Sequence, residues 1–260
     1  MDGRADGKRR QLVTLKVTVL GSSGMWATRE RACAGYLVQI ADKNVLLDCG
    51  AGAWRNLLAH SDHLAVDAVV LSHRHPDHVS DLFMLLHARL YGGKEPLPEI
   101  PLWAPAETLE RLSGFYKELD SAFRVSSVSP GDKIAIGAGS FSFFEMAHPP
   151  DTVGVRVETD GVVFAYSSDT GPTGDLEGLA RSADLFVCEA TLQDSDESWE
   201  GHLSASQAGE AAARAGVAKI VLTHLPPGRD AGLSLAEAHR TTGGAEVQLA
   251  SDGLQLEVKP

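Results

Sequence analysis

Cysteines and long apolar runs are scarce in this sequence. The three cysteines, Cys33, Cys49 and Cys188, are an odd number without a CxxC pair, so they do not form a disulfide framework. A reducing cytoplasm is therefore the expected location. No apolar run reaches the about 18–20 residues of a membrane span, and the polar segment 1–10 lacks the apolar core of a secretory signal. We expect a disordered tail over 1–10, a single domain over 11–260 and no membrane partner.

Positive charge is also in short supply. The chain has 23 Lys and Arg against 35 Asp and Glu, which gives a formal net charge of −12. A large, sequence-independent nucleic-acid surface needs clustered basic residues, so the balance counts against one, although bound divalent cations or a local basic patch would offset it. The cluster Lys8-Arg9-Arg10 is short and belongs to the expected tail. RNA is therefore an alternative partner rather than the first expectation.

Strands precede helices in both halves of the chain, which predicts an α/β (α+β) fold. The expected strands are 11–20, 34–40, 44–48, 65–71, 133–136, 140–145, 153–158, 162–166, 184–189 and 219–223, with short ones near Val247 and Leu256. The expected helices are 53–60, one from after His78 to about Tyr91, 106–119, 205–215 and 235–241. Ser204 and Gln207 form a capping-box pattern. No low-complexity linker divides the halves, so we expect two sheets packed face to face with helices outside.

The most informative segment is Ser72-His73-Arg74-His75-Pro76-Asp77-His78. It places three imidazoles and a carboxylate within six residues, directly after the apolar run 66–71. His73 and His75, two positions apart, point the same way where the strand ends. Asp77 and His78 lie at the start of the next helix and approach from another side, so the segment offers ligands to two metal ions. Asp77 alone would be a helix N-cap, a role that is compatible with ligation.

Further candidates stand at similar positions. His148, Asp169 and His224 each follow an expected strand, and His202 precedes an expected helix. Loops at strand ends are where a sheet presents functional groups. Six of the 10 histidines belong to this pattern, which random placement of core histidines would rarely produce. The others, His60, His63, His87 and His239, are interpreted as surface residues.

The ordered motifs are HxHxDH, a lone His after a strand, Ser-x-Asp-Thr, Glu-Ala-Thr with a later His-Leu-Ser, and a final Leu-Thr-His. This set resembles the metallo-β-lactamase fold family. It is most similar to the branch of tRNA 3′-processing endonucleases (RNase Z) and bacterial cyclic-nucleotide phosphodiesterases. The resemblance extends from Val17 to about Val258. It implies a four-layer αββα sandwich with a dinuclear metal site between the sheets, in agreement with the packed sheets expected above.

The resemblance implies a ligand set. One metal would be held by His73, His75 and His148, the other by Asp77, His78 and His224, with Asp169 bridging them. Imidazole and carboxylate ligands suit zinc and also admit manganese. Two such ions lower the pKa of a shared water from about 15.7 toward about 7 and clamp the oxygens of a phosphoryl group. A phosphodiester is a fitting target because its transition-state charge lies on oxygens that cations stabilise.

Supporting residues follow from the same resemblance. His202 is expected to be the general acid for the leaving alkoxide, with Glu189 orienting it and raising its pKa. Asp77 is expected to accept the proton of the bridging water as well. Asp48 resembles a buried aspartate that steadies a ligand histidine. Weaker candidates for phosphate contact are Ser22, Ser23, Ser167 and Thr170.

The absence of an inserted arm narrows the range of expected substrates. Many tRNA-processing members carry a flexible arm between the residues that match His148 and Asp169. Here these residues are only 21 positions apart, and an expected hairpin takes most of that length. We therefore expect hydrolysis of a small phosphodiester, such as 3′,5′-cAMP, through a metal-bridging hydroxide. The alternatives are a tRNA 3′-processing endoribonuclease, another hydrolase of this fold, and a non-enzymatic metal- or nucleotide-binding regulator. By analogy with relatives, the apolar helical region 83–119 is expected to form a homodimer interface.

Overall fold

The computed structural model describes residues 14–259, so the expected tail over 1–10 lies outside the described residues. The first sheet has the strand order β14-β1-β2-β3-β4-β5-β6. Its strands are β1 (Leu15–Gly21), β2 (Gly35–Ile40), β3 (Lys43–Cys49), β4 (Ala68–Val70), β5 (Ile100–Ala104), β6 (Phe123–Ser127) and β14 (Gln255–Val258). β14, β1, β2 and β3 pair antiparallel, and β3 to β6 pair parallel. The carboxyl ends of β3 and β4 therefore meet at one edge.

The second sheet mirrors this arrangement, with the order β13-β12-β11-β10-β9-β8-β7. Its strands are β7 (Lys133–Ile136), β8 (Gly139–Glu145), β9 (Val153–Thr159), β10 (Val162–Tyr166), β11 (Leu185–Glu189), β12 (Lys219–Thr223) and β13 (Glu246–Leu249). β7 to β10 pair antiparallel, and β10 to β13 pair parallel. The carboxyl ends of β10, β11 and β12 are thus neighbours, and the residues that follow them come together.

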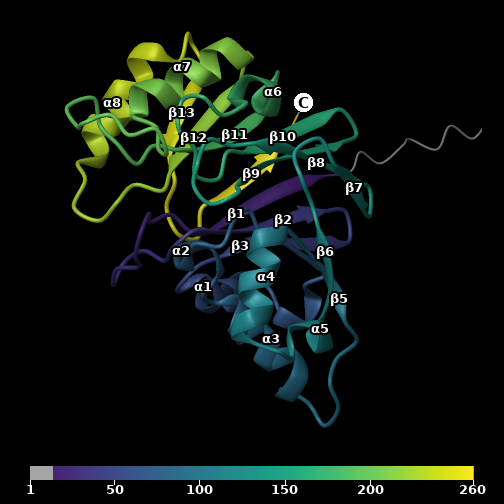
Figure 1. The fold of residues 1–260 in the computed structure, drawn as a ribbon. Helices are drawn as coiled ribbons and strands as arrows, with labels where there is room; N and C mark the ends of the chain where they lie inside the picture. The colour runs from purple at the N-terminus through teal and green to yellow at the C-terminus, as the bar shows by residue number, and fades with distance from the viewer. Residues whose placement is uncertain (1–13, 260) are drawn as a thin grey trace, which may run out of the picture.

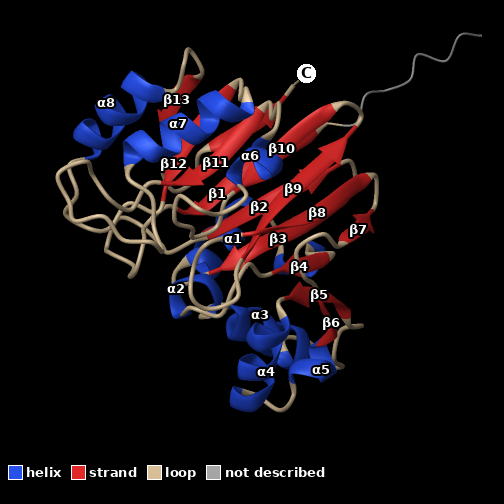
Figure 2. Cartoon of the chain, turned by 45° about the horizontal axis from the view of Figure 1, so that its top comes forward, coloured by secondary structure: helices blue, strands red, loops and turns tan. Residues whose placement is uncertain are grey.

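The two sheets pack face to face, with helices on both outer sides (Figures 1 and 2). One buried cluster fills the space between the sheets and includes the aromatic side chains of Tyr36, Phe141, Phe143, Phe164 and Tyr166. The first sheet is covered by α1 (Ala53–His60), α3 (Leu82–Tyr91) and α4 (Ala106–Phe115), and the second by α6 (Leu176–Ala180), α7 (Ala205–Ala215) and α8 (Ala231–Thr241). The expected four-layer αββα sandwich is confirmed.

Several expected boundaries are wrong. The helix expected after His78 is split into α2 (Pro76–Val79) and α3, because the Asp81 carboxylate between them accepts hydrogen bonds from the backbone N–H groups of Gly52 and Trp54. The strand expected over 65–71 is limited to β4, since a 3₁₀ turn (His63–Ala65) precedes it. The expected helix 106–119 ends at Phe115 and is followed by α5 (Leu119–Ala122).

The sequence pattern did not predict two strands of the first sheet, the edge strand β6 and its neighbour β5. β6 has the sequence Phe-Arg-Val-Ser-Ser and is largely exposed, and β5 contains a proline. An exposed, polar sequence is common in an edge strand such as β6. β5 pairs with both β4 and β6, and a proline is rare in such a strand, so neither sequence resembles the apolar run of a buried strand. The short helix α6 and the start of α8 at Ala231, four residues before the expected start, also differ from the expectation.

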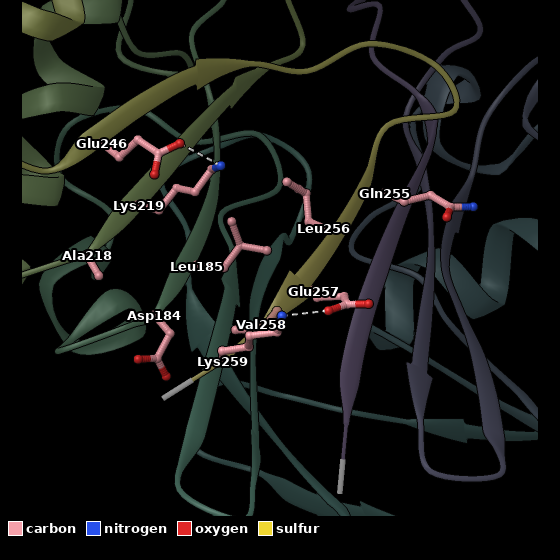
Figure 3. Close-up of a pocket in the computed structure, with 10 residues that line it drawn as sticks. All are labelled: Asp184, Leu185, Ala218, Lys219, Glu246, Gln255, Leu256, Glu257, Val258 and Lys259. Carbon is pink, nitrogen blue, oxygen red and sulfur yellow. Dashed lines mark ion pairs between the residues drawn. The ribbon is translucent and has the colours of Figure 1, made fainter.

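A cavity of about 420 Å³ lies at the amino ends of the parallel strands of the second sheet (Figure 3). It is lined by the first residues of β11, β12 and β13 and by β14, and the Lys219–Glu246 ion pair (2.8 Å) lies in its wall. The candidate ligands follow the opposite, carboxyl ends of these strands. This cavity is therefore separate from the site. Among the helices of residues 14–259, none is long and apolar enough to cross a membrane.

Candidate metal centre

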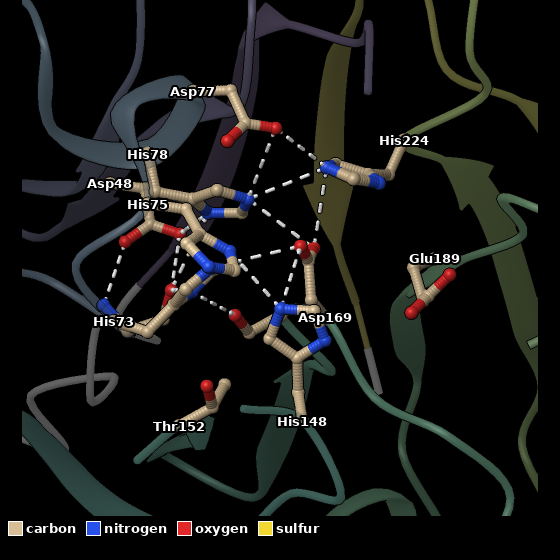
Figure 4. A network of polar contacts seen from close by, with 12 residues as sticks. Asp48, His73, His75, Asp77, His78, His148, Thr152, Asp169, Glu189 and His224 are labelled. Atoms are coloured by element: carbon tan, nitrogen blue, oxygen red, sulfur yellow. Dashed lines mark hydrogen bonds and ion pairs between the residues drawn. The ribbon is translucent and has the colours of Figure 1, made fainter. Parts of the chain in front are cut away.

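The structure brings all seven expected ligands to one place at the carboxyl edges of both sheets (Figure 4). His73 and His75 lie in the loop after β4, and Asp77 and His78 lie in α2. His148, Asp169 and His224 follow β8, β10 and β12, respectively. Loops at the carboxyl ends of parallel strands are the usual place for functional groups in α/β folds. The cluster therefore combines residues from both halves of the chain.

One group of ligand atoms comes from His73, His75, His148 and Asp169, and these atoms all lie within 4.8 Å of one another. Nε2 of His73 is 3.7 Å from Oδ2 of Asp169, and Nε2 of His148 is 3.8 Å from the same oxygen. Nδ1 of His75 lies 3.1 Å from Nε2 of His148. Three imidazoles thus surround one oxygen of a carboxylate.

A second group comes from Asp77, His78 and His224. Nε2 of His224 lies 3.2 Å from Oδ2 of Asp77 and 3.3 Å from Oδ1 of Asp169. Nε2 of His78 is also 3.3 Å from Oδ1 of Asp169. The two oxygens of Asp169 therefore face different groups, Oδ2 the first and Oδ1 the second. This is the position of a bridging carboxylate.

The donor set fits divalent cations. Nε2 of His73 and Oδ1 of Asp169 are buried without a hydrogen-bond partner, and buried polar atoms of this kind are rare unless an ion or water satisfies them. The nitrogen lone pairs of three nearby imidazoles also need an electron-pair acceptor, which a metal ion supplies. Nitrogen and carboxylate ligands are those that zinc, manganese and similar ions bind. The residues present are thus able to bind metal ions.

The pKa values of most of these side chains also favour metal binding. Burial lowers the pKa of His73, His75 and His148, which keeps these imidazoles neutral. Burial alone would raise the pKa of Asp169, but the nearby His224 and His78 hold it well below its usual range. Metal ligation requires a neutral imidazole and an ionised carboxylate. These four side chains are therefore in their ligating forms. At His78 burial lowers the pKa, but the carboxylates of Asp169 and Asp48 outweigh it and raise the pKa well above its usual value, so metal binding there would release a proton.

Asp48 supports the cluster from behind. Its φ is +56°, in the left-handed region, and the carboxylate is fully buried. Oδ2 lies 2.7 Å from Nδ1 of His78 and accepts hydrogen bonds from the hydroxyls of Ser72 (2.7 Å) and Tyr166 (2.9 Å). A proton held on Nδ1 leaves Nε2 of His78 with the lone pair that a metal needs. This is the contact expected for Asp48.

His148 and His224 receive similar support from residues that sequence reasoning missed. Nδ1 of His148 donates to the Gly201 carbonyl at 2.7 Å. The Thr191 hydroxyl donates to the His224 carbonyl (3.3 Å), which leaves its oxygen to accept from Nδ1 of His224 (3.0 Å). Thr191 stands in the Glu-Ala-Thr motif, and Gly201 precedes His202. Their position within or next to these motifs is the one feature of the sequence that could have indicated their roles.

Glu189 and His202 form a buried pair beside the cluster. Oε1 of Glu189 lies 2.7 Å from Nδ1 of His202 and also accepts from the Thr170 N–H at 2.7 Å. Burial lowers the pKa of His202, but the Glu189 carboxylate outweighs it and the net pKa is raised. A ring nitrogen of His202 also lies within 4.8 Å of ligand atoms of Asp169 and His224. Since Nδ1 is held by Glu189, Nε2 is the nitrogen free to act.

The four hydroxyl residues expected to contact phosphate are buried. Ser22 donates to Asp252 (2.9 Å), and Ser23 donates to the Trp26 carbonyl (2.9 Å). Ser167 accepts from the Glu189 N–H (3.0 Å), and the Thr170 oxygen accepts from the Ala147 N–H (3.0 Å). These contacts hold the loops of the site together. Phosphate contact by these side chains stays a prediction.

The remaining histidines and the cysteines contribute no ligand atom to these groups. His60, His87 and His239 are exposed and His63 is half-buried, in agreement with the surface interpretation. Cys33, Cys49 and Cys188 are buried free thiols. A cavity of about 390 Å³ adjoins His148 and extends past Ala106 and Ser129. Of the proposed ligands, His148 is the one that lines this cavity.

Known proteins are similar to this chain in both sequence and fold. The family model described as "Beta-lactamase superfamily domain" matches residues 43–225. An uncharacterized protein of Mycobacterium leprae (strain TN) is 37% identical, over 83% of this chain and 79% of that protein. "Ribonuclease Z" of Archaeoglobus fulgidus is 26% identical, over 94% of this chain and 97% of its own.

A solved structure adds a third match. The metallo-beta-lactamase fold protein YhfI of Bacillus subtilis has a TM-score of 0.86 to this chain at 26% identity, and the match covers 94% of this chain and 99% of that one. That protein carries the name "Probable metallo-hydrolase". The family match covers well over half of the chain. The cluster of His and Asp residues that can bind metal ions lies where loops of both sheets meet. The chain belongs to the beta-lactamase superfamily and is a metallo-hydrolase of the metallo-β-lactamase fold.

Proposed function

We propose that this protein hydrolyses the phosphodiester of a small nucleotide, such as 3′,5′-cAMP, with two divalent ions, zinc or manganese. The observation that carries the proposal is the position of Asp169, whose two carboxylate oxygens face two separate groups of imidazoles. When bound, two such ions supply Lewis acidity and lower the pKa of a water molecule. A phosphodiester is the target that makes use of both effects, since negative charge develops on its oxygens.

Asp77 is the residue proposed to accept the proton of the attacking water. Its Oδ2 accepts from the Met25 N–H (2.8 Å) and contacts Nε2 of His224 (3.2 Å), which leaves Oδ1 for the proton. Burial raises the pKa of Asp77, but the contact with His224 and the charge of His78 lower it below its ordinary value. The carboxylate is therefore ionised at neutral pH and able to accept a proton.

His202 is proposed to protonate the leaving alkoxide from Nε2. Glu189 holds the proton on Nδ1 at 2.7 Å and favours the charged imidazolium. The ring centroids of His202 and His224 are 5.6 Å apart, so the proton donor stands beside the ligand cluster. An alkoxide is a poor leaving group without a proton. A regulator without turnover would have no need of this pair.

A small substrate is favoured over RNA by two features. The antiparallel hairpin β9–β10, with Val162 opposite Thr159, fills most of the segment between His148 and Asp169. No arm extends from this part of the structure to hold a large RNA. The loop 193–201 beside the site contains no Lys or Arg, and two of its four carboxylates, Glu197 and Glu200, lie outside its ion pairs with Arg229 and Arg240. Such a loop does not attract the long phosphate backbone of an RNA.

The second candidate is an RNA 3′-end endonuclease. It is supported by the similarity to the ribonuclease Z of Archaeoglobus fulgidus over nearly the whole chain. The test compares turnover of 3′,5′-cAMP and cleavage of a precursor tRNA by the same metal-loaded protein. Faster hydrolysis of cAMP supports the small substrate, and faster cleavage of the tRNA supports the endonuclease. Tight nucleotide binding without product would favour the regulator.

The variants Asp169→Ala and His75→Ala complete the experiment. Both should lose hydrolysis, because each removes a proposed ligand. Asp42→Asn, an exposed carboxylate outside the site, is the matched control and should retain it. Activity that survives the loss of Asp169, or that persists after chelation of the metal, would overturn the proposal.

We further propose a cytoplasmic homodimer. Tyr91 is 64% exposed and Phe115 75% exposed, and both lie in the region 83–119. Phe83 packs against Phe115 with ring centroids 5.0 Å apart. Exposed aromatic side chains are enriched at interfaces. Light scattering of the wild type and of Phe115→Asp should give a dimer and a monomer, respectively; a monomeric wild type would contradict this.

A further inference from the structure

The loop between β11 and α7 exposes a large aromatic ring at the rim of the metal centre. The Trp199 side chain is 48% exposed. Its ring centroid lies 4.8 Å from that of His202, at an interplanar angle of 58°, and 5.8 Å from that of His148, at 81°. Trp199 therefore adjoins both the proposed proton donor and a proposed metal ligand, while a large part of its ring stays open to solvent.

The position of this ring is fixed by close backbone packing. A Cβ on Gly201 would lie 2.8 Å from the Trp199 ring, and a Cβ on Gly171 would lie 1.6 Å from the carbonyl oxygen of Glu200. The Gly201 carbonyl also accepts the 2.7 Å hydrogen bond from His148. Both glycines thus allow the loop to lie tightly against the site. An exposed ring held in this way is preorganised to bind a ligand.

We propose that Trp199 is the surface on which the base of the nucleotide substrate stacks, an inference that rests on the proposed function. Tryptophan is normally most of the way buried, so half-exposure of the ring beside reactive groups calls for a partner. In a nucleotide the base is one sugar away from the phosphate. When the phosphate lies over the ligand cluster, the base therefore reaches the rim where Trp199 stands.

The chemistry of the loop favours a base over other ligands. The loop 193–201 contains no basic residue; Asp194 and Asp196 are ion-paired with Arg240 and Arg229, and Glu197 and Glu200 lie next to the ring in the sequence. These two carboxylates offer a phosphate no attraction, whereas a neutral base has a π-face that stacks on an aromatic ring. The cavity beside His148 is lined by no Phe, Tyr or Trp. Trp199 is therefore the better stacking surface, and purines, with the larger ring system, should bind better than pyrimidines.

The test compares two substrates that differ only in the base: 3′,5′-cAMP and the corresponding cyclic phosphate of 1-deoxyribose. Trp199→Ala should raise KM for cAMP at least about fivefold, with little change in kcat and no change for the base-free substrate. Trp199→Phe should restore most of the loss. Leu64→Ala, which removes an exposed apolar side chain outside the site and outside the region 83–119, should behave as the wild type.

Two results would overturn the inference. An equal loss on both substrates would mean that the ring only shields His148 and His202. An unchanged KM in Trp199→Ala, together with a raised KM in Ala106→Trp, would place the base in the cavity beside His148.

A binding measurement separates this inference from the proposed chemistry. Adenosine, which has no phosphate, is titrated into the metal-free protein while the indole N–H resonances are followed, with Trp199→Phe identifying the signal. A shift of the Trp199 signal by adenosine and not by ribose supports stacking, even if cAMP is not hydrolysed. Hydrolysis of cAMP without such a shift and without a KM effect would overturn the inference alone.

Discussion

Oδ2 of Asp48 lies 2.7 Å from Nδ1 of His78, and both residues are fully buried. The same oxygen accepts from Tyr166, which is 118 positions away and belongs to the other sheet. One carboxylate therefore contacts a proposed ligand histidine and joins the two sheets behind the candidate metal centre. We expect metal binding to depend on this contact.

Replacing Asp48 by Asn should weaken metal binding. Asn adopts the left-handed backbone of this position almost as readily as Asp, so the change tests the charge and not the backbone. We expect a loss of about 10–100-fold in metal affinity and of about 1–3 kcal/mol in the free energy of unfolding, since buried donors lose their acceptor. Competition with a fluorescent zinc chelator and urea unfolding measure the two effects. Asp42→Asn should change neither, and an Asp48→Asn variant with wild-type affinity would contradict the prediction.

Thr191→Val tests the support of His224. Valine has nearly the same shape but lacks the oxygen that lies 3.0 Å from Nδ1 of His224. His224 has a φ of +60°, a backbone conformation that is uncommon for residues other than glycine. We expect about tenfold weaker binding of one metal ion, measured by isothermal titration with zinc. Thr191→Ser keeps the oxygen and should bind as the wild type; equal binding by the valine variant would show that Thr191 has no such role.

The ligand cluster was predictable because its members are marked locally. His73, His75 and His78 share one short segment, and Asp169 and His224 each follow an apolar run that reads as a strand. The contacts around them were not predictable in the same way. Thr191 and His224 are 33 positions apart, and Trp199 meets His148 only through a folded loop. Such pairs depend on how separate strands end side by side, which no local pattern specifies.

The fold shows a similar division. Strands such as β8 and β10 alternate or run apolar because both sheets bury a face between them. The edge strand β6 lacks that burial, and β5 contains a proline, so neither sequence has the pattern of a buried strand. The break between α2 and α3 comes from hydrogen bonds that Asp81 makes to a distant turn. The burial of a strand face can be predicted from the sequence pattern, whereas hydrogen bonds between distant residues cannot.

The cysteines should be unreactive in the folded protein. Burial, with a smaller contribution from Asp77, raises the pKa of the Cys33 thiol to about 12. Burial also raises the pKa of Cys49 and Cys188 well above the usual range. The thiolate is the reactive form, so a raised pKa leaves neutral, unreactive thiols at pH 8 and still at pH 9. Iodoacetamide should modify all three in urea and none in the native state, as read by mass spectrometry; rapid native labelling of any one would contradict this.

Removal of metal should lower the stability of the protein without unfolding it. Three buried hydrophobic clusters hold the sheets and helices together and do not involve the ligands. An ion that binds only the folded state adds about 2.7 kcal/mol at 100 times its Kd, so zinc should raise the Tm and EDTA should lower it. Asp169→Asn should lose most of this response, because its carboxylate faces both groups of imidazoles. Circular dichroism melts with and without zinc give the comparison, with Asp42→Asn as the control. A variant lacking the Asp169 carboxylate that still gains the full wild-type increase in Tm would show that zinc stabilises the fold from another site.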